Sequence, residues 1–521
     1  MHYTNPVLSG FYPDPSVCRV GDWFYLVNST FAYLPGIPVH RSRDLVNWEL
    51  ISHVIDRNDQ LSFEGAGISR GLFAPSIRFN KGTFYVTCTN IDNGGNFYVT
   101  ATDPAGPWSD PVWLPDAIGI DPSVFFDDDG SAWYVGTRPA PEGCAYSGNW
   151  EVWVQRLDVE KKCLVGETYS LWRGALRDCV WPEGPHVYKI NGMYYLLIAE
   201  GGTGPDHAVS IARSPALTGP WEGFRKNPVL THRHLGKSAQ VVNVGHADLV
   251  DDSSGNWFMV LLASRPMQGY SLLGRETFIA PVRWEDGWPC IDTPDGLLAE
   301  SGEVPDSIAS HDSFLPLPAC EHFDGSVLPR GFLGLRTPAE PVYSLSERPG
   351  FLRLRHLPGT LHGTAPVSFI GRRQEHHSWV IRSLFEVSSR KEGDTAGLAL
   401  LQAEDWHYRL EFAVAGKERV LRLMCAEGSS DRLIAECPLP FSRDENCRLE
   451  LACRCDGLSL SFFWSLPGGT ARCLASKIDA SVLSTERAGG FVGTVLGVFA
   501  SSNGEPSTAV TDVDWFEYRP I

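Results

Sequence analysis

Five stretches in the first half of the chain share one pattern, and this repeat is the feature that most restricts the possible folds. In each stretch an anchor residue precedes a short β-rich run, a turn that contains Gly, and a second run rich in aromatic and aliphatic residues. Turns of this composition supply the positive φ that a tight β-hairpin needs. The stretches are PDPSVCRVGDWFYLV (13–27), APSIRFNKGTFYVTCT (74–89), DPSVFFDDDGSAWYVG (121–136), EGPHVYKINGMYYLLIA (183–199) and HADLVDDSSGNWFMVLLA (246–263).

The spacing of these hairpins predicts a β-propeller. They recur with a period of roughly 45–65 residues, which suits one propeller blade per repeat. Helical periodicity is scarce and aromatic residues make up 11% of the chain, so we expect an all-β protein whose residues 1–302 form five blades. A β-sandwich with coincidentally similar hairpins is the alternative, and five matching hairpins disfavour it.

The hexapeptide FYPDPS (11–16) contains the first acidic anchor. Asp14 lies between Pro13 and Pro15, and proline restricts both its own φ and the residue before it. We therefore expect Asp14 to be held in an extended conformation. A surface turn is the alternative, because Pro and Asp are common in turns. The repeat favours an Asp14 that faces the propeller axis.

The anchors of the other hairpins are expected to meet Asp14. The innermost strand of each blade lines the central channel of a propeller. Asp14, Asp121, Glu183 and His246 should therefore converge on one end of the axis, while Pro75 holds the fifth position without a charge.

Composition narrows the classes of function. A chain of 521 residues is expected to form two or three domains, and 43% hydrophobic and 20% charged residues indicate a globular protein. A net charge of −18 without an evident basic patch disfavours nucleic acid or a membrane as partner. The N-terminus, MHYTNPVLSG, has no signal-peptide pattern, and an odd count of 13 cysteines favours reduced thiols. Both features predict a cytoplasmic protein.

The chain changes character after the propeller. Residues 303–320 are rich in Pro and Ser and predict a linker. In residues 321–521, strand-like stretches alternate with turns, which predicts a C-terminal β-sandwich of the jelly-roll or concanavalin type. Examples are FLRLRH, HYRLEFAV, RVLRLMCA, CRLELACR and LSLSFFW.

Three carboxylates on one axis suggest acid–base chemistry. Buried acids are rare unless they are paired or functional, and neighbouring like charges raise at least one pKa. Glycoside hydrolysis uses such a set, since one carboxylic acid protonates the leaving oxygen while one carboxylate activates water or attacks the sugar. Acids that cap turns or bind calcium are the alternative.

The ordered motifs resemble glycoside hydrolase family 43, in the branch of β-xylosidases and α-L-arabinofuranosidases with a C-terminal β-sandwich. The similarity rests on YPDPS, IDPSVFFDDDG and WPEGPHVYKINGMYYLLIAEGGT, and it extends to GLFAPSIRF, GHADLV, LGRETFIAPVRWEDGWP and the C-terminal TDVDWFEYRP. The resemblance covers nearly the whole chain.

This resemblance implies a role for each carboxylate. Asp14 would be the general base that activates water, and Glu183 the general acid that protonates the glycosidic oxygen. Asp121 would orient Glu183 and raise its pKa, because an ionised neighbour favours the neutral acid. The family inverts anomeric configuration, which requires the carboxyl groups of Asp14 and Glu183 to lie roughly 6.5–9.5 Å apart.

Five further residues are expected at the sugar site. Arg275 can donate a fork of hydrogen bonds to sugar hydroxyls, with a structural salt bridge as the alternative. Phe31 would pack on the sugar or wall off the pocket, with a plain core aromatic as the alternative. Thr203 would line the same pocket, although Gly201-Gly202 could equally mark only a tight turn. Phe73 stands where relatives often carry Trp, so the aromatic shelf is smaller and the substrate preference stays open.

His246 is the fifth of these residues. Some family members hold calcium near this histidine, usually through water. A direct hydrogen-bonding role is the commoner use of a lone His, so no cofactor is expected to be required, and Ca²⁺ near His246 stays an open alternative.

These expectations combine into one predicted function. The chain would be an exo-acting, inverting glycosidase that releases xylose from non-reducing ends of β-1,4-xylo-oligosaccharides, with possible activity on α-L-arabinofuranosides. A predominant α-L-arabinofuranosidase and a silent carbohydrate-binding protein are the alternatives. The substrate would be a xylo-oligosaccharide or an oligosaccharide from arabinoxylan. In this branch a loop of the sandwich narrows the site, for which Phe491 is a candidate, and a homo-oligomer is possible.

Overall fold

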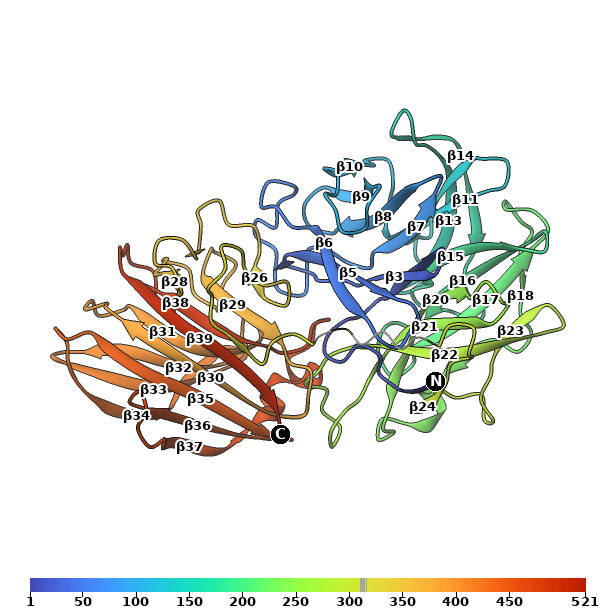
Figure 1. Ribbon diagram of the computed structural model, residues 1–521. Coiled ribbons are helices and arrows are strands. Elements are labelled where there is room, and N and C mark those ends of the chain that lie inside the picture. Colours follow the sequence, from blue (N-terminus) through green and yellow to red (C-terminus); the bar gives the residue numbers. More distant parts are fainter. Residues whose placement is uncertain (310–313, 315) are drawn as a thin grey trace.

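The computed structural model describes residues 1–309, 314 and 316–521, and two β-rich parts lie side by side in it (Figure 1). The blue-to-green part is built from the N-terminal residues, and the orange-to-red part from the C-terminal ones. Among the described residues the only α-helix is α1 (Thr485–Ala488), so the all-β prediction is confirmed. Within that same part of the chain, no helix is long and apolar enough to span a bilayer. In the predicted linker 303–320, residues 310–313 and 315 lie outside the described residues.

The N-terminal part is a propeller of five antiparallel sheets, each with four main strands that follow one another along the chain. Blade one contains β2 (Ser16–Val20), β3 (Trp23–Val27), β5 (Gly36–Ser42) and β6 (Glu49–Ile55). Blade two contains β7 (Ser76–Asn80), β8 (Thr83–Asn90), β9 (Gly95–Ala101) and β10 (Val112–Trp113). Blade three contains β11 (Ile120–Phe126), β12 (Ala132–Pro139), β13 (Trp150–Asp158) and β14 (Cys163–Trp172). Blade four contains β15 (Glu183–Ile190), β16 (Met193–Glu200), β17 (Ala208–Ser214) and β18 (Glu222–Gly223), and a fifth strand, β19 (Leu230–Thr231), also pairs with β17. Blade five contains β20 (Val242–Asp251), β21 (Trp257–Ser264), β22 (Glu276–Glu285) and β23 (Trp288–Ile291).

The five hairpins predicted from the sequence form the two inner strands of each blade. The ring closes because β20 of the last blade contacts β2 of the first. Outside the blades, β1 (His2–Thr4) pairs with β24 (Ser301–Glu303), so the two ends of the propeller segment are joined by backbone hydrogen bonds. A short 3₁₀ helix, η1 (Arg233–Leu235), lies between blades four and five.

A fourth carboxylate on the inner strands ties four blades together. Asp248 on β20 is fully buried and accepts hydrogen bonds from Arg78 Nη1 at 2.8 Å, Ser16 Oγ at 2.7 Å and Tyr188 Oη at 2.5 Å. Although burial raises its pKa, Arg78 and His186 outweigh that effect and hold the pKa well below the usual range. Asp248 is therefore a structural anion paired inside the propeller.

The C-terminal part is a sandwich of two large sheets. The first runs β27 (Tyr343–Ser344), β28 (Leu352–Arg355), β39 (Val510–Pro520), β30 (Ser378–Val387), β35 (Cys447–Asp456), β36 (Ser459–Ser465) and β37 (Arg472–Asp479), with β25 (Cys320–Glu321) also on β39. The second runs β34 (Ser430–Ser442), β33 (Glu418–Glu427), β32 (Trp406–Ala415), β31 (Thr395–Ala403), β38 (Val495–Ser501), β29 (Ser368–Arg373), β26 (Leu333–Leu335) and β4 (Tyr33–Leu34). The 3₁₀ helix η2 (Ala480–Leu483) precedes α1. Since β4 belongs to the propeller segment, one sheet is shared by both parts.

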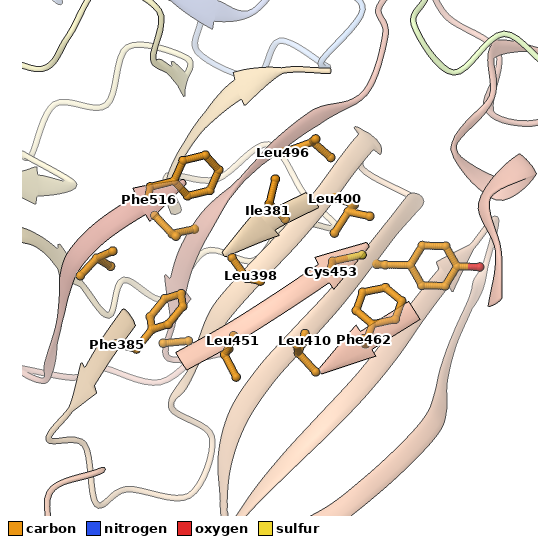
Figure 2. Close-up of a cluster of buried hydrophobic side chains, with 14 of the residues drawn as sticks. Ile381, Phe385, Leu398, Leu400, Leu410, Leu451, Cys453, Phe462, Leu496 and Phe516 are labelled. Atoms are coloured by element: carbon orange, nitrogen blue, oxygen red, sulfur yellow. The ribbon is translucent and has the colours of Figure 1, made fainter. Parts of the chain in front are cut away.

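Alternating side chains from the two sheets fill the space between them (Figure 2). Along β35 the buried and exposed positions alternate almost strictly, as a strand with one face on the core requires. Leu451 and Cys453 of that strand lie in the same buried cluster as Leu398 and Leu410 of the facing sheet. One continuous hydrophobic core therefore joins the two sheets.

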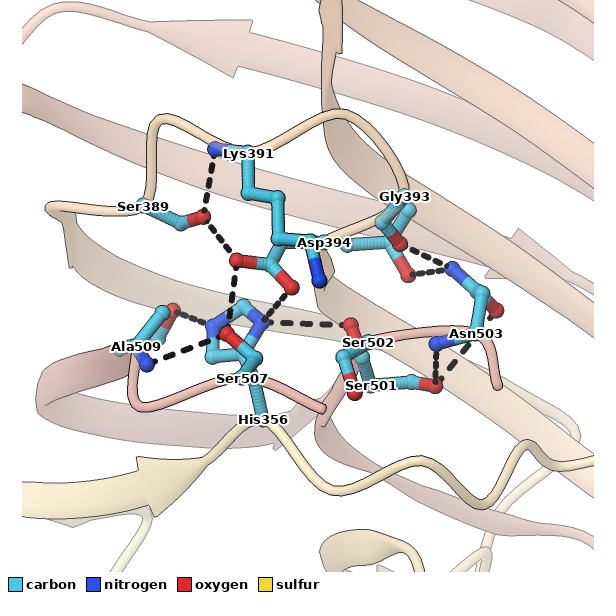
Figure 3. Close-up of polar contacts among 12 residues, drawn as sticks. His356, Ser389, Lys391, Gly393, Asp394, Ser501, Ser502, Asn503, Ser507 and Ala509 are labelled. Atoms are coloured by element: carbon cyan, nitrogen blue, oxygen red, sulfur yellow. Dashed lines mark hydrogen bonds and ion pairs between the residues drawn. The ribbon is translucent and has the colours of Figure 1, made fainter. Parts of the chain in front are cut away.

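Polar contacts close one edge of the sandwich (Figure 3). Buried Asp394 accepts hydrogen bonds from Ser389 and from Ser507 Oγ, the latter at 3.0 Å. His356 shares a 2.8 Å hydrogen bond with Thr511 Oγ1. These bonds join loops that come from distant parts of the sequence, so they fasten the ends of β38 and β39 to the rest of the sandwich.

Candidate active site

A cavity of about 370 Å³ lies where the inner strands of the propeller begin, and it has the size of a small-ligand site. All eight residues predicted for the site line it, together with Phe491 of the sandwich. They are Asp14, Phe31, Phe73, Asp121, Glu183, Thr203, His246 and Arg275.

The anchors at the cavity have an unusual backbone conformation. Asp14, Asp121 and His246 have φ values of 51°, 52° and 48°, in the left-handed region that non-glycine residues rarely adopt. The expectation of an extended Asp14 is therefore wrong, because the tertiary contacts of the anchor outweigh the local preference beside proline. Register shifts interrupt the inner hairpins beside Asp121 and His246. Backbone strain of this kind persists only where the surrounding contacts enforce it, and it is common at functional sites.

Asp14 is surrounded by groups that favour its ionised form. Arg275 Nη1 donates to Asp14 Oδ1 at 2.8 Å, Ser29 Oγ donates to Oδ2, and His246 Nδ1 lies 3.8 Å from Oδ1. Burial raises the pKa of Asp14, but Arg275, His246 and the Ser29 hydrogen bond outweigh it, so the net pKa is lowered. The arrangement keeps this carboxylate deprotonated and able to accept a proton.

Glu183 and Asp121 have the opposite electrostatics. Burial, together with the charges of Asp121 and Asp14, raises the pKa of Glu183 well above its usual value. Burial raises the pKa of Asp121 to about 6, although His246 lowers it, and Gly184 N donates to Asp121 Oδ2 at 3.1 Å. Both shifts disfavour a state in which the two carboxyl groups are ionised together, so the pair favours holding one proton.

Three phenylalanines form one wall of the cavity. The Phe491 ring stacks on Phe31 with centroids 5.8 Å apart and planes 19° apart, and Phe73 meets both rings edge-on. Phe491 lies between α1 and β38, so this part of the wall comes from the sandwich. The sequence pointed to Phe491 or a neighbour as a candidate, and the structure places Phe491 at the cavity.

Arg275 links this wall to Asp14. Besides the ion pair with Asp14, its guanidinium donates to Thr203 Oγ1 at 3.0 Å and to the carbonyl oxygen of Phe491 at 3.2 Å. The salt bridge that was the alternative for Arg275 is thus present, and contact with sugar hydroxyls stays a prediction. One guanidinium positions a carboxylate and a loop of the second domain at once.

Several lining residues were not found from the sequence. Trp150 and Trp181 both face the cavity, and Ser29 reaches Asp14 from blade one. Trp181 stands directly before the Pro-Glu-Gly-Pro segment that contains Glu183, and this position was the only local sign of a role. The position alone does not distinguish a cavity-lining residue from a core aromatic. Which way these side chains face depends on how the blades are placed around the axis.

The residues near His246 were tested as metal ligands. In the described part of the chain, no three His, Cys, Asp or Glu side chains are grouped so that they could hold an ion directly. Asp14 beside His246 already pairs with Arg275, and Asp248 pairs with Arg78. Both of these carboxylates have internal cationic partners, so neither is free to bind a metal directly.

Comparisons with known proteins identify the families of both parts of the chain. The model of glycosyl hydrolases family 43 matches residues 3–289, and the model of the β-xylosidase C-terminal concanavalin A-like domain matches residues 320–519. Together the two matches span the propeller and the sandwich.

Individual relatives match along the entire chain. A xylosidase/arabinosidase of Butyrivibrio fibrisolvens is 45% identical, with 99% of both chains covered. The solved structure described as Bacteroides ovatus Xyloglucan PUL GH43B has a TM-score of 0.92 and 36% identity, with full coverage of both chains. The structure of a xylan β-1,4-xylosidase from Bacillus halodurans has a TM-score of 0.92 and 32% identity, covering 99% of this chain and 100% of the other. The propeller, the three carboxylates and the sandwich loop thus belong to a glycoside hydrolase of family 43 with the β-xylosidase C-terminal domain.

Proposed function

We propose that the protein is an exo-acting, inverting glycosidase that releases xylose from the non-reducing ends of β-1,4-xylo-oligosaccharides and also accepts α-L-arabinofuranosides. The observation that carries the proposal is the opposite electrostatics of two buried carboxyl groups in one cavity. Asp14 has a lowered pKa and Glu183 a raised one. A base and an acid that coexist at the same pH are what inverting hydrolysis needs.

In the proposed mechanism Glu183 donates its proton to the glycosidic oxygen as the bond to the anomeric carbon breaks. Asp14 takes a proton from a water molecule that attacks the opposite face of the sugar. Asp121 is a positioning residue that keeps Glu183 protonated before the reaction. The products are a free sugar of inverted configuration and an alcohol at the leaving group.

The closed wall of the cavity supports attack at chain ends. Phe491 and its loop cover one side through contacts with Phe31 and Phe73. A cavity that is blocked on one side accepts a terminal sugar more easily than the interior of a polymer. The proposed substrate is thus an oligosaccharide end.

A predominant α-L-arabinofuranosidase is the second candidate. Phe73 leaves more room than a tryptophan would at this position, which can alter the sugar that fits. A relative from Bacteroides ovatus, 36% identical over 99% of this chain, is named a non-reducing end α-L-arabinofuranosidase. Comparison of kcat/KM on 4-nitrophenyl β-D-xylopyranoside and 4-nitrophenyl α-L-arabinofuranoside decides between the two. Inactivity on both would favour a silent binding protein instead.

The role of Glu183 has a direct test. A Glu183→Ala variant is expected to lose far more activity on poor leaving groups than on activated aryl glycosides, because only the poor ones need protonation. Equal losses on both kinds of substrate would contradict the acid assignment.

We also propose that catalysis needs no metal. Asp14, whose Oδ1 lies 3.8 Å from His246 Nδ1, is paired with Arg275, and Asp248 is paired with Arg78, which supports chemistry by side chains alone. Treatment with EDTA is expected to leave kcat/KM unchanged, whereas a loss restored by Ca²⁺ would place an ion near His246.

A further inference from the structure

Trp181 is an aromatic residue at the cavity with two costly features. Its φ is 47°, a conformation that is strained for a bulky side chain, and the residue is 39% exposed. Strain of this kind persists only where neighbouring structure enforces it, and it is concentrated at functional sites. An exposed and strained indole that lines the cavity is therefore expected to have a binding role.

Two glycines make space for the Trp181 indole. A Cβ atom at Gly148 would lie 3.1 Å from ring atom Cδ2, and one at Gly202 would lie 2.8 Å from Cε3. In addition, Trp181 N donates to the carbonyl oxygen of Gly148 at 2.7 Å. Segments from blades three and four thus hold the indole in one place.

The loop that carries Trp181 is held by a buried carboxylate. Glu200 is fully buried at the end of β16, and its Oε2 accepts from Ala175 N at 2.8 Å and from Cys179 Sγ at 3.3 Å. Its Oε1 accepts from Ser210 Oγ at 2.9 Å. Gly201 follows Glu200 in the chain, and its backbone N donates to the carbonyl oxygen of Val180 at 2.9 Å. The loop 173–181 therefore depends on Glu200 at two points.

Exposure separates the two ends of the cavity. Phe31 is 2% exposed at the closed end, under Phe491, whereas Trp181 is exposed. Since Glu183 protonates the oxygen between the two sugars in the proposed mechanism, the leaving sugar lies beside Glu183 and toward the open end. Trp181, two residues before Glu183, and half-buried Trp150 are the aromatic lining residues outside the phenylalanine wall.

We propose that Trp181, with Trp150, forms the platform on which the leaving sugar stacks, and that Glu200 is the positioning residue that holds this platform. The inference rests on the proposed glycosidase function. The indole faces match the apolar C–H face of a pyranose ring and do not select a charged leaving group. The platform therefore favours a xylan-derived leaving group over one without a sugar ring.

The test compares two substrates that differ only in the leaving group, β-1,4-xylobiose and β-D-xylosyl fluoride. For Trp181→Ala, kcat/KM on xylobiose is expected to fall about three- to tenfold more than on the fluoride, because one stacking contact is lost. Trp181→Phe is expected to recover part of the difference. Leu176→Ala is the matched control, since Leu176 is 38% exposed on the same loop and does not line the cavity.

Glu200→Gln tests the positioning role. The variant keeps the shape of the side chain but weakens the bonds to Ala175 and Cys179. A larger loss on xylobiose than on the fluoride, through a raised KM, is expected. A lower melting temperature with equal losses on both substrates would make Glu200 merely structural and overturn its assignment.

The outcomes separate this inference from the proposed function. If the wild type hydrolyses neither substrate, the proposed release of xylose fails. Calorimetric titration of xylose and xylobiose into the Glu183→Gln background then tests whether the Trp181 platform binds a second sugar. Xylobiose that binds more tightly than xylose, with the advantage lost in Trp181→Ala, supports it. The platform proposal is overturned if Trp181→Ala affects both substrates equally or both ligands equally. It is also overturned if neither sugar binds.

Discussion

At the scale of single residues, the surroundings of two similar carboxyl groups in the site shift their pKa values in opposite directions. Asp14 and Glu183 are both buried carboxyl groups, and burial raises the pKa of each. Arg275 and Ser29 reverse that effect for Asp14, while Asp121 adds to it for Glu183. The chemical difference between base and acid therefore resides in their neighbours.

Arg275→Met tests the control of Asp14. Without the cation, burial dominates and the pKa of Asp14 rises, so the base becomes protonated at a higher pH. The acid limb of the kcat/KM profile is therefore expected to move to higher pH. In addition, kcat/KM at neutral pH is expected to fall by up to about a hundredfold, because Asp14 also loses the partner that positions it. An unshifted acid limb would show that Arg275 does not set this pKa. Arg283→Met, in an exposed ion pair with Glu285, is the control.

Asp121→Asn tests the pair with Glu183. The like charge that raises the pKa of Glu183 disappears, so the acid loses its proton at a lower pH. The basic limb of kcat/KM is expected to move to lower pH, and activity to fall by about 10²–10⁴. A basic limb at the wild-type position would contradict this coupling.

At the scale of elements, the site depends on a loop that the sandwich contributes. Phe491 packs on Phe31 and Phe73, and its carbonyl oxygen accepts from Arg275. The propeller alone therefore lacks part of the cavity wall.

Phe491→Ala is expected to open that wall. A ring that lines the cavity is lost, and one aromatic contact with the sugar is worth about 0.5–1.5 kcal/mol, so kcat/KM should fall roughly tenfold, mainly through KM. Phe351→Ala, a phenylalanine of the sandwich that contacts Arg348 and does not line the cavity, is the control. An unchanged KM in Phe491→Ala would show that the sandwich loop does not contact the substrate.

The sandwich itself contains a close strand contact. A Cβ atom at Gly497 on β38 would lie 2.4 Å from the carbonyl oxygen of Ile370 and 2.7 Å from Cα of Gly371. Gly497→Ala is therefore expected to reduce the free energy of unfolding by about 1–3 kcal/mol, measured by urea denaturation. Gly363→Ala provides the comparison, because an added Cβ there would have no neighbour closer than 4.0 Å and its φ lies outside the left-handed region.

At the scale of the whole molecule, the two parts are coupled by shared backbone. The propeller strand β4 pairs with β26, and Arg336 of the sandwich donates to the carbonyl oxygen of Ala66. Glu404 accepts from Arg336 and, at 2.8 Å, from Ile68 N. We expect the chain to unfold in one calorimetric transition.

Glu404→Ala is expected to weaken that coupling. The change leaves Arg336 Nη2 and Ile68 N without their acceptor, which should lower the free energy of unfolding by about 1–3 kcal/mol. The transition is expected to broaden or split as the parts separate. Glu436→Ala, which removes an exposed ion pair with Arg422, should have almost no effect. Similar losses in both variants would contradict a role for Glu404 at the interface.

The sequence alone determined the architecture and the main chemical groups. Repeated hairpins with turn residues at a regular spacing are local signals, so the five blades and the three carboxylates could be predicted from them. The left-handed Asp14, the Ser29 and Arg275 contacts that lower its pKa, and Trp150 and Trp181 could not. These features depend on how distant segments approach one another, because the same local sequence can orient a side chain toward the axis or away from it. Only the tertiary structure decided which neighbours each carboxylate has, and these neighbours separate a proton acceptor from a proton donor.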